Sequence, residues 1–104
     1  MIVTNLNQAP GYVVTELLGI AKGSIAQGSG SLGAVVDSIQ QAESEEYTTL
    51  MEKCRLEAER RMRAHAKRME ADAVLGVTYT MTPIGTAQAM DVYCYGTAVK
   101  LRPE

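Results

Sequence analysis

The chain has 104 residues, 46% of them hydrophobic, and its formal net charge is -2. This length predicts one domain spanning residues 1–104, and the composition is that of a folded globular protein rather than a disordered one. The charge balance provides no overall cationic field, so nucleic acid and anionic membrane surfaces are not expected as partners.

The cysteine content and the start of the chain indicate a cytoplasmic protein. The two cysteines, Cys54 and Cys94, are too few for the disulfide framework of a small secreted scaffold. No stretch approaches the roughly 18 apolar residues of a transmembrane helix, and the first residues show no signal-peptide pattern. A reducing cytoplasm is therefore the expected location.

The first long element in the chain is a predicted strand over residues 12–26, which are rich in β-branched and apolar types. Gly19 and Gly23 lie inside it and are expected to mark bends or bulges. A Gly/Ser loop follows at residues 27–31, and Ser31 can cap a short helix over residues 32–39.

The dominant element is a predicted amphipathic helix over residues 43–69, a segment without Gly or Pro. Its acidic residues lie near the start and its basic residues near the end, which suits the helix dipole. One face carries a long stripe that consists of Tyr47, Leu50, Met51, Cys54, Ala58, Met62, His65 and Met69. This stripe has helical periodicity and is expected to pack on a sheet.

Two further strands are predicted at residues 73–82 and 88–101, where apolar residues alternate with small or polar ones. Their closeness in sequence predicts an antiparallel hairpin. On the last strand, one face carries Tyr93, Tyr95, Thr97, Val99 and Leu101, and the other carries Val92, Cys94, Gly96 and Ala98. The expected fold is α+β, with a three-stranded antiparallel sheet, the long helix across one face, and the short helix.

The sheet face that the helix leaves uncovered is expected to be an oligomer interface. Its Tyr93, Tyr95 and Thr97 side chains, together with open sheet edges, suggest contact with another subunit. The expected partner is therefore a second copy of the same chain.

A glycine-rich motif of the form G-x-G-x-x-G precedes the short helix. Backbone N–H groups of Gly28, Gly30 and Ser31 could hold an anion there. A dinucleotide site is not expected, because the chain runs from helix to helix and not through a parallel βαβ unit. The alternative is a flexible linking turn.

The residue types that most often bind metals are represented by His65, the only histidine, and the two cysteines. His65 and Cys54 share one helix face but are separated by about 16 Å of helix rise, so one chain cannot bind one ion through both. Cys94 would approach Cys54 if the helix covers its face of the sheet, and Met62 and Met69 flank His65 as soft donors. His65, Cys54 and Cys94 are thus candidate ligands for Zn or Cu, though not all in one site. The alternatives are a core-edge histidine bonded to backbone or tyrosine, and cysteines that act as small hydrophobic residues.

No catalytic constellation is visible in the sequence. A single histidine gives no support for a Ser-His-Asp set, and no pair of carboxylates suggests a glycosidase. Basic and acidic residues of the long helix are interleaved at i,i+4 spacing, as in Glu57–Arg61 and Glu59–Arg63, which favours a solvated face over a nucleic-acid stripe. The chain is therefore not expected to be an enzyme.

Short motifs along the whole chain form a pattern. They are Ala9 to Tyr12, Leu18 to Ile20, Gly23, Glu43, Tyr47, Arg55, Ala58, Ala66, Ala71 to Val74 and Tyr95 to Val99. This pattern resembles the YbjQ-like family, which is named for heavy-metal binding. The resemblance implies a dodecin-like α+β fold and a ring-shaped homo-oligomer, a pentamer, with no established activity. The family has Gly at position 70 where this chain has Glu70, which predicts a strained or differently terminated helix.

The function expected from these observations is that of a non-enzymatic homo-oligomeric ring that binds a heavy or transition metal between subunits. The alternative, by analogy with the dodecin-like fold, is a module that binds or stores a small molecule. Tyr93 and Tyr95 could stack on such a ligand.

Overall fold

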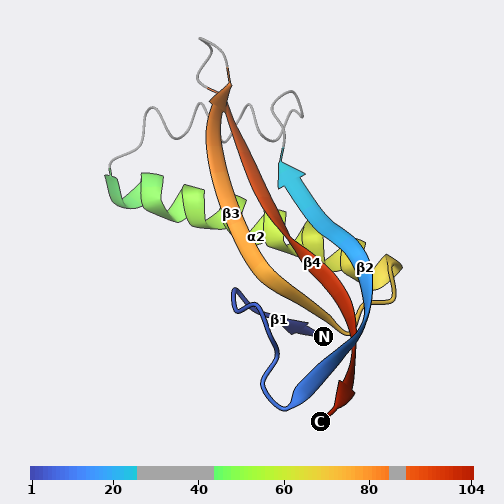
Figure 1. The fold of residues 1–104 in the computed structure, drawn as a ribbon. Coiled ribbons are helices and arrows are strands. Elements are labelled where there is room, and N and C mark those ends of the chain that lie inside the picture. The colour runs from blue at the N-terminus through green and yellow to red at the C-terminus, as the bar shows by residue number, and fades with distance from the viewer. Residues whose placement is uncertain (26–43, 85–88) are drawn as a thin grey trace.

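The computed structural model describes residues 1–25, 44–84 and 89–104 (Figure 1). The elements in this part of the chain are β1 (Ile2–Val3), β2 (Tyr12–Ile25), α2 (Ser44–Arg68), β3 (Ala73–Ile84) and β4 (Ala89–Pro103). The long helix and the three long strands predicted from the sequence are therefore confirmed. The short helix predicted over residues 32–39 lies outside the described residues.

The strands form one mixed sheet in the order β1-β3-β4-β2. β2 and β3 each pair with β4 in antiparallel direction, which confirms the predicted hairpin of the last two strands. The prediction of a three-stranded antiparallel sheet is wrong, because Ile2 and Val3 add a fourth strand that runs parallel to β3. A two-residue strand is too short to show the period-2 alternation by which a strand is recognised.

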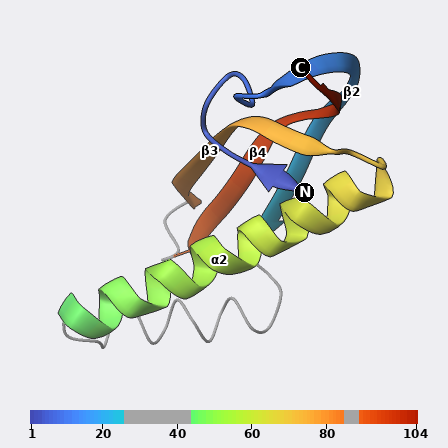
Figure 2. The ribbon, with the colours of Figure 1, turned by 90° about the horizontal axis from the view of Figure 1, so that it is seen from below.

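Helix α2 lies across one face of the sheet (Figure 2), and small side chains allow a close approach. The fully buried alanines of this core are Ala58 and Ala66 of α2, Ala21 of β2 and Ala98 of β4. At Gly23 of β2 even a methyl group would overlap the Ala58 carbonyl oxygen and the Met62 nitrogen. The backbone of α2 therefore rests directly on β2 at this residue.

The side chains of β4 alternate between the two faces of the sheet, as the sequence pattern predicts. Val92, Cys94 and Ala98 belong to the core cluster beneath α2. Val99 belongs to a second, smaller cluster together with Ala73 of β3. Side chains on adjacent strand positions point to opposite faces, so the sheet carries one core on each side, and the larger one lies under the helix.

The outer side of α2 is charged, and its ions are paired along the helix. Glu57 contacts Arg61 at 3.1 Å and Glu59 contacts Arg63 at 3.0 Å, which confirms the predicted i,i+4 pairs. Among the described residues, no helix has both the length and the apolar content needed to cross a membrane.

Helix α2 ends in a Schellman motif. The N–H of Ala71 donates to the Ala66 carbonyl oxygen at 3.1 Å, and the N–H of Glu70 donates to the Lys67 carbonyl oxygen at 3.0 Å. The motif places one residue in the left-handed conformation, and Glu70 adopts it with φ of 61°. This confirms the strained helix end, because the conformation costs a residue with a Cβ about 1–2 kcal/mol.

Replacing Glu70 with glycine is expected to raise the free energy of unfolding by about 0.5–1 kcal/mol. The gain in stability is smaller than the energy of the backbone strain that is relieved, because glycine also adds conformational entropy to the unfolded chain. Urea denaturation followed by circular dichroism measures the change. The matched control Glu52→Gly, inside α2, should lose about 1 kcal/mol. Destabilisation at both positions would contradict the left-handed conformation of Glu70.

Candidate functional site

Two sulfur atoms are in contact in the core beneath α2. The Cys94 thiol of β4 donates a hydrogen bond to the thioether sulfur of Met62 in α2, and the two sulfurs are 3.5 Å apart. Both side chains are fully buried, with 0% exposure. Thiolate and thioether sulfurs are the ligands that select soft ions such as Cu(I). The Cys94–Met62 sulfur pair is therefore a candidate metal site.

The two sulfurs come together because Met62 lies on the inward side of the helix and Cys94 lies on the inward side of the strand beneath it. Met62 follows Ala58 by one turn on the inward stripe of α2, and Cys94 lies on the inward face of β4. Burial is the main cause that raises the pKa of the Cys94 thiol, and the Glu59 carboxylate adds to it. The thiol is thus protonated at neutral pH, so a metal ion must displace its proton.

A polar cluster borders the sulfur pair. Tyr79 is the cross-strand neighbour of Cys94, and its hydroxyl donates to the Glu59 carboxylate at 2.5 Å. Glu59 also accepts from Arg63 Nε at 3.0 Å, and the Arg55 guanidinium lies 5.1 Å from the centre of the Tyr79 ring. The Tyr79 hydrogen bond, with Arg63 and Arg55, lowers the pKa of Glu59. Burial and the bond to Glu59 raise the pKa of Tyr79 to about 12. The cluster thus holds a firmly ionised carboxylate and a firmly protonated phenol, not an activated base or nucleophile.

The three predicted metal ligands are not gathered in one place. Cys54 and Cys94 are free thiols in the same core cluster, whereas His65 reaches the edge of the sheet at Lys22. Among the side chains that the structure describes, no group of three His, Cys, Asp or Glu residues is placed to hold one ion. The described residues therefore offer a two-sulfur site, and not the set of three or four such ligands that zinc usually takes.

His65 connects α2 to the outer edge of β2. Its Nδ1 atom accepts a hydrogen bond from the backbone N–H of Lys22 at 3.0 Å, so Nδ1 carries no proton. In the neutral imidazole the proton is then on Nε2, which acts as a donor. A metal ion at Nε2 would need the proton on Nδ1, where it would face the Lys22 N–H. His65 thus makes the backbone hydrogen bond expected of a core-edge histidine, which was the alternative to a metal ligand.

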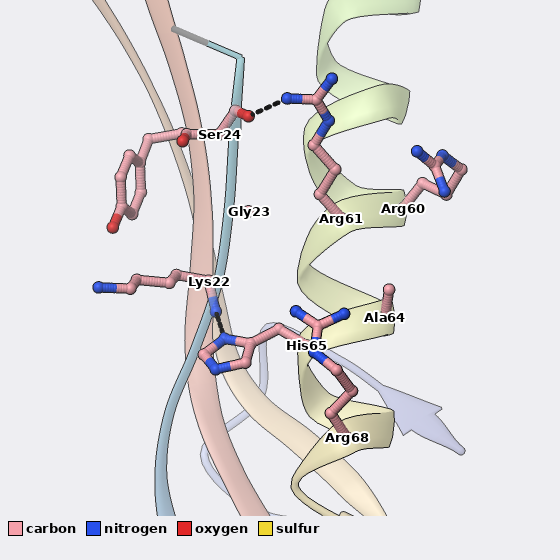
Figure 3. Close-up of a pocket in the computed structure, with 9 residues that line it drawn as sticks. Lys22, Gly23, Ser24, Arg60, Arg61, Ala64, His65 and Arg68 are labelled. Carbon is pink, nitrogen blue, oxygen red and sulfur yellow. Dashed lines mark hydrogen bonds between the residues drawn. The ribbon is translucent and has the colours of Figure 1, made fainter.

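A basic groove of about 650 Å³ lies between the outer edge of β2 and the C-terminal half of α2 (Figure 3). Its charged and titratable lining residues, apart from Tyr93, are Lys22, Arg60, Arg61, His65 and Arg68. Figure 3 shows the side chains of Lys22 and Arg60 pointing away from the gap between strand and helix, whereas Arg61 and His65 extend into it. The described residues that line the groove include no acidic side chain. The groove is therefore a candidate anion site.

The predicted interface residues lie on the sheet face that points away from α2. Tyr95 is 37% exposed, Thr97 is exposed, and Tyr93 packs edge-to-face on Tyr95 with ring centres 5.9 Å apart. Ile20, the cross-strand partner of Thr97, is 64% exposed, and Leu17 of the same strand is 73% exposed. These five residues are named the outer-face patch below, and they form an apolar surface that the described part of the chain does not cover.

Two features of these sites were not visible in the sequence. The Met62–Cys94 contact depends on how α2 is placed along β4, although both residues fall on the predicted inward faces. The basic groove depends on the edge of β2 lying beside α2, whereas the sequence indicated only a solvated helix face. The anion site predicted in the Gly/Ser loop lies outside the described residues, and its members are Gly28, Gly30 and Ser31.

The whole chain is similar to proteins of one family. Residues 1–102 match the YbjQ family model, described as "Putative heavy-metal-binding". A UPF0145 protein of Thermococcus kodakarensis is 40% identical over 107 residues, covering 100% of this chain and 93% of the relative. A UPF0145 protein of Thermus thermophilus is 38% identical, covering 99% and 92%. A solved structure from Pediococcus pentosaceus, a DUF74-family protein of unknown function, covers 98% of both chains with a TM-score of 0.55 and 19% identity. That likeness concerns the fold alone.

Proposed function

This chain belongs to the YbjQ family, and we propose that it binds one soft metal ion, Cu(I), in each subunit of a homo-oligomeric ring. The observation that carries the proposal is the Cys94–Met62 sulfur pair, whose sulfurs are 3.5 Å apart inside the core. Two sulfurs this close can both lie within a metal–sulfur bonding distance of about 2.3 Å from one ion. Because both side chains are fully buried, the ion would lie inside a subunit and not between subunits.

Copper fits this site better than zinc, the other ion expected from the sequence. A thioether is a soft ligand that suits Cu(I), whereas structural zinc sites use four ligands drawn from Cys, His, Asp and Glu. The only histidine of the sequence, His65, already uses its Nδ1 lone pair to accept a hydrogen bond from the Lys22 N–H. The donor set therefore favours a monovalent soft ion.

The chemistry of the cysteines does not fit nucleophilic catalysis. Burial raises the pKa of Cys54, and it is also the main cause of the raised pKa of Cys94. A catalytic cysteine instead needs a lowered pKa and access to solvent. Both thiols are free, which is consistent with a reducing compartment such as the cytoplasm. Reducing conditions would also keep copper in the monovalent state.

The outer-face patch supports assembly with further copies of the same chain. Contiguous exposed apolar surface marks interaction sites, and a domain of this length buries a limited core by itself. A second copy is the occupant proposed here, and the ring would be the pentamer that the resemblance to the family implies. The dodecin-like arrangement of such a ring stays a prediction.

Replacing Tyr95 with aspartate is expected to break the ring into smaller species while the secondary structure is kept. A carboxylate in the outer-face patch would have to lose its hydration when the interface forms. Size-exclusion chromatography with light scattering measures the mass, and circular dichroism checks the fold. The control Leu56→Asp changes an apolar residue of α2 that is 53% exposed, and it should leave the mass unchanged. A wild-type mass equal to the 11.2 kDa chain at every concentration would refute the assembly.

Native mass spectrometry tests both parts of the proposed function. The protein is loaded with Cu(I) without oxygen and then challenged with a competing chelator. One copper per subunit on an assembled ring is expected. Copper-free protein would contradict the metal site, whereas copper-loaded monomers would contradict only the ring.

A further inference from the structure

We propose that the basic groove binds an oxyanion of the phosphate class, either free phosphate or a small phosphomonoester, with Arg68 and the Nε2–H of His65 as donors. This inference goes beyond the metal site. It depends on neither the sulfur pair nor the ring, and its tests are separate from theirs.

Positive charge is concentrated around the groove in a chain whose net charge is -2. Of the ten Lys and Arg residues, six line this groove or the adjoining hollow beside Met1, namely Lys22, Arg60, Arg61, Arg63, Lys67 and Arg68. Arg60 and Arg61 are partly neutralised, because both contact Glu57. No acidic side chain in the described part of the chain forms an ion pair with Arg68. Arg68 therefore keeps its full charge for a ligand.

The edge of β2 at the groove is already occupied by side chains of α2. The N–H of Lys22 donates to His65, and Arg61 donates to the carbonyl oxygen of Ser24 at 2.8 Å. Free edge groups would otherwise pair with an added strand. Because these groups are bonded, the groove favours a small ligand over an extended peptide.

The imidazole nitrogen of His65 that is not bonded to Lys22 carries a proton and not a lone pair. The bond from the Lys22 N–H to Nδ1 leaves the proton on Nε2. An anion can accept from this N–H, whereas a metal cation cannot bind there without reversing the tautomer. The cationic side chains nearby act in the same direction, because they repel a metal ion and attract an anion.

The arrangement of the donors favours phosphate over a carboxylate. His65 and Arg68 are three residues apart on α2, and both line the groove. The guanidinium fork matches two phosphate oxygens, and a third oxygen remains for the imidazole N–H. The volume of about 650 Å³ exceeds that of a bare phosphate and leaves room for the organic part of a monoester.

Isothermal titration calorimetry at low ionic strength tests the proposal with two probes, inorganic phosphate and ribose 5-phosphate. Saturable binding of one ligand per chain is expected. Arg68→Gln should weaken it at least about tenfold, because the guanidinium fork supplies two charge-assisted hydrogen bonds. The control Lys67→Gln removes the same charge from the same helical turn but not from the groove lining, and it should weaken binding less than about twofold. Tighter binding of ribose 5-phosphate would identify a monoester as the ligand, and equal binding would identify free phosphate.

The imidazole of His65 gives a second readout. Long-range proton–nitrogen NMR spectra should show the Nε2–H tautomer, and the Nε2 signal should shift when phosphate is added. The shift should be the same in Cys94→Ala, because Cys94 does not line the groove. Absence of saturable binding of both probes, equal weakening by Arg68→Gln and Lys67→Gln, or an unchanged Nε2 signal would each overturn the anion site.

Discussion

Replacing Gly23 with alanine is expected to lower the free energy of unfolding by about 3 kcal/mol or more. A Cβ at this position would overlap the Ala58 carbonyl oxygen, the Met62 nitrogen and the Arg61 carbonyl carbon. These are backbone atoms of a helix, so they cannot rotate away as a side chain can. Helix α2 would have to move off β2, and overpacking of this kind costs typically about 1–3 kcal/mol and occasionally more.

The substitution therefore removes a large fraction of the roughly 5–15 kcal/mol that stabilises an ordinary domain. Chemical denaturation followed by circular dichroism measures the loss. Gly11→Ala is the matched control, because a Cβ there meets nothing within 4 Å, whereas φ is 85°. It should lose only the backbone strain, about 1–2 kcal/mol. A smaller loss at Gly23 than at Gly11 would show that α2 does not rest on β2 at residue 23.

Replacing Cys94 with alanine is expected to weaken Cu(I) binding by at least about 100-fold, because it removes the one thiolate of the site. Changes in groups that only support a metal ligand already cost about 10–100-fold. Met62→Leu keeps the volume of the side chain, and the loss of the thioether should weaken binding about tenfold. Competition with a chromophoric Cu(I) chelator measures these affinities.

Cys54→Ala is the matched control for the copper series. Cys54 is also a buried free thiol of the same core, but no sulfur contact links it to Met62 among the described residues. Copper affinity should therefore change less than about twofold, while stability falls in both cysteine variants. Equal copper loss in the two variants would mean that the sulfur pair is not the site.

The copper affinity should also depend on pH. Binding breaks the S–H bond of Cys94, forms a sulfur–copper bond and releases one proton to solvent. Because burial is the main cause that raises the pKa of this thiol, it is protonated at neutral pH. Apparent affinity should therefore rise about tenfold per pH unit until the thiol ionises.

Much of the fold could be predicted because its long elements have clear periodicity. The apolar stripe of α2 places Met62 on the inward face of the helix. The alternation of side chains along β4 places Cys94 on the inward face of the strand. Strand β1 was missed because its pairing with β3 is non-local and only two residues long. The expected irregularity at Gly19 is present as a register shift, but Gly23 marks a helix contact and not a bulge.

The candidate sites were harder to predict because they depend on the placement of α2 over the sheet. The sequence showed His65 and Cys54 on one helix face, and it left open whether either binds metal. Only the three-dimensional arrangement puts the Met62 sulfur beside Cys94 and the imidazole of His65 beside the Lys22 N–H. The first contact is the basis of the proposed soft-metal site, and the second leaves Nε2 of His65 as a hydrogen-bond donor.

X-ray absorption spectroscopy at the copper edge, on protein loaded with one Cu(I) per chain, tests the soft-metal site most directly. The sulfur pair predicts two sulfur ligands, from Cys94 and Met62, and no nitrogen ligand. A spectrum that requires an imidazole nitrogen, or one that is unchanged in Cys94→Ala, would contradict the proposed function.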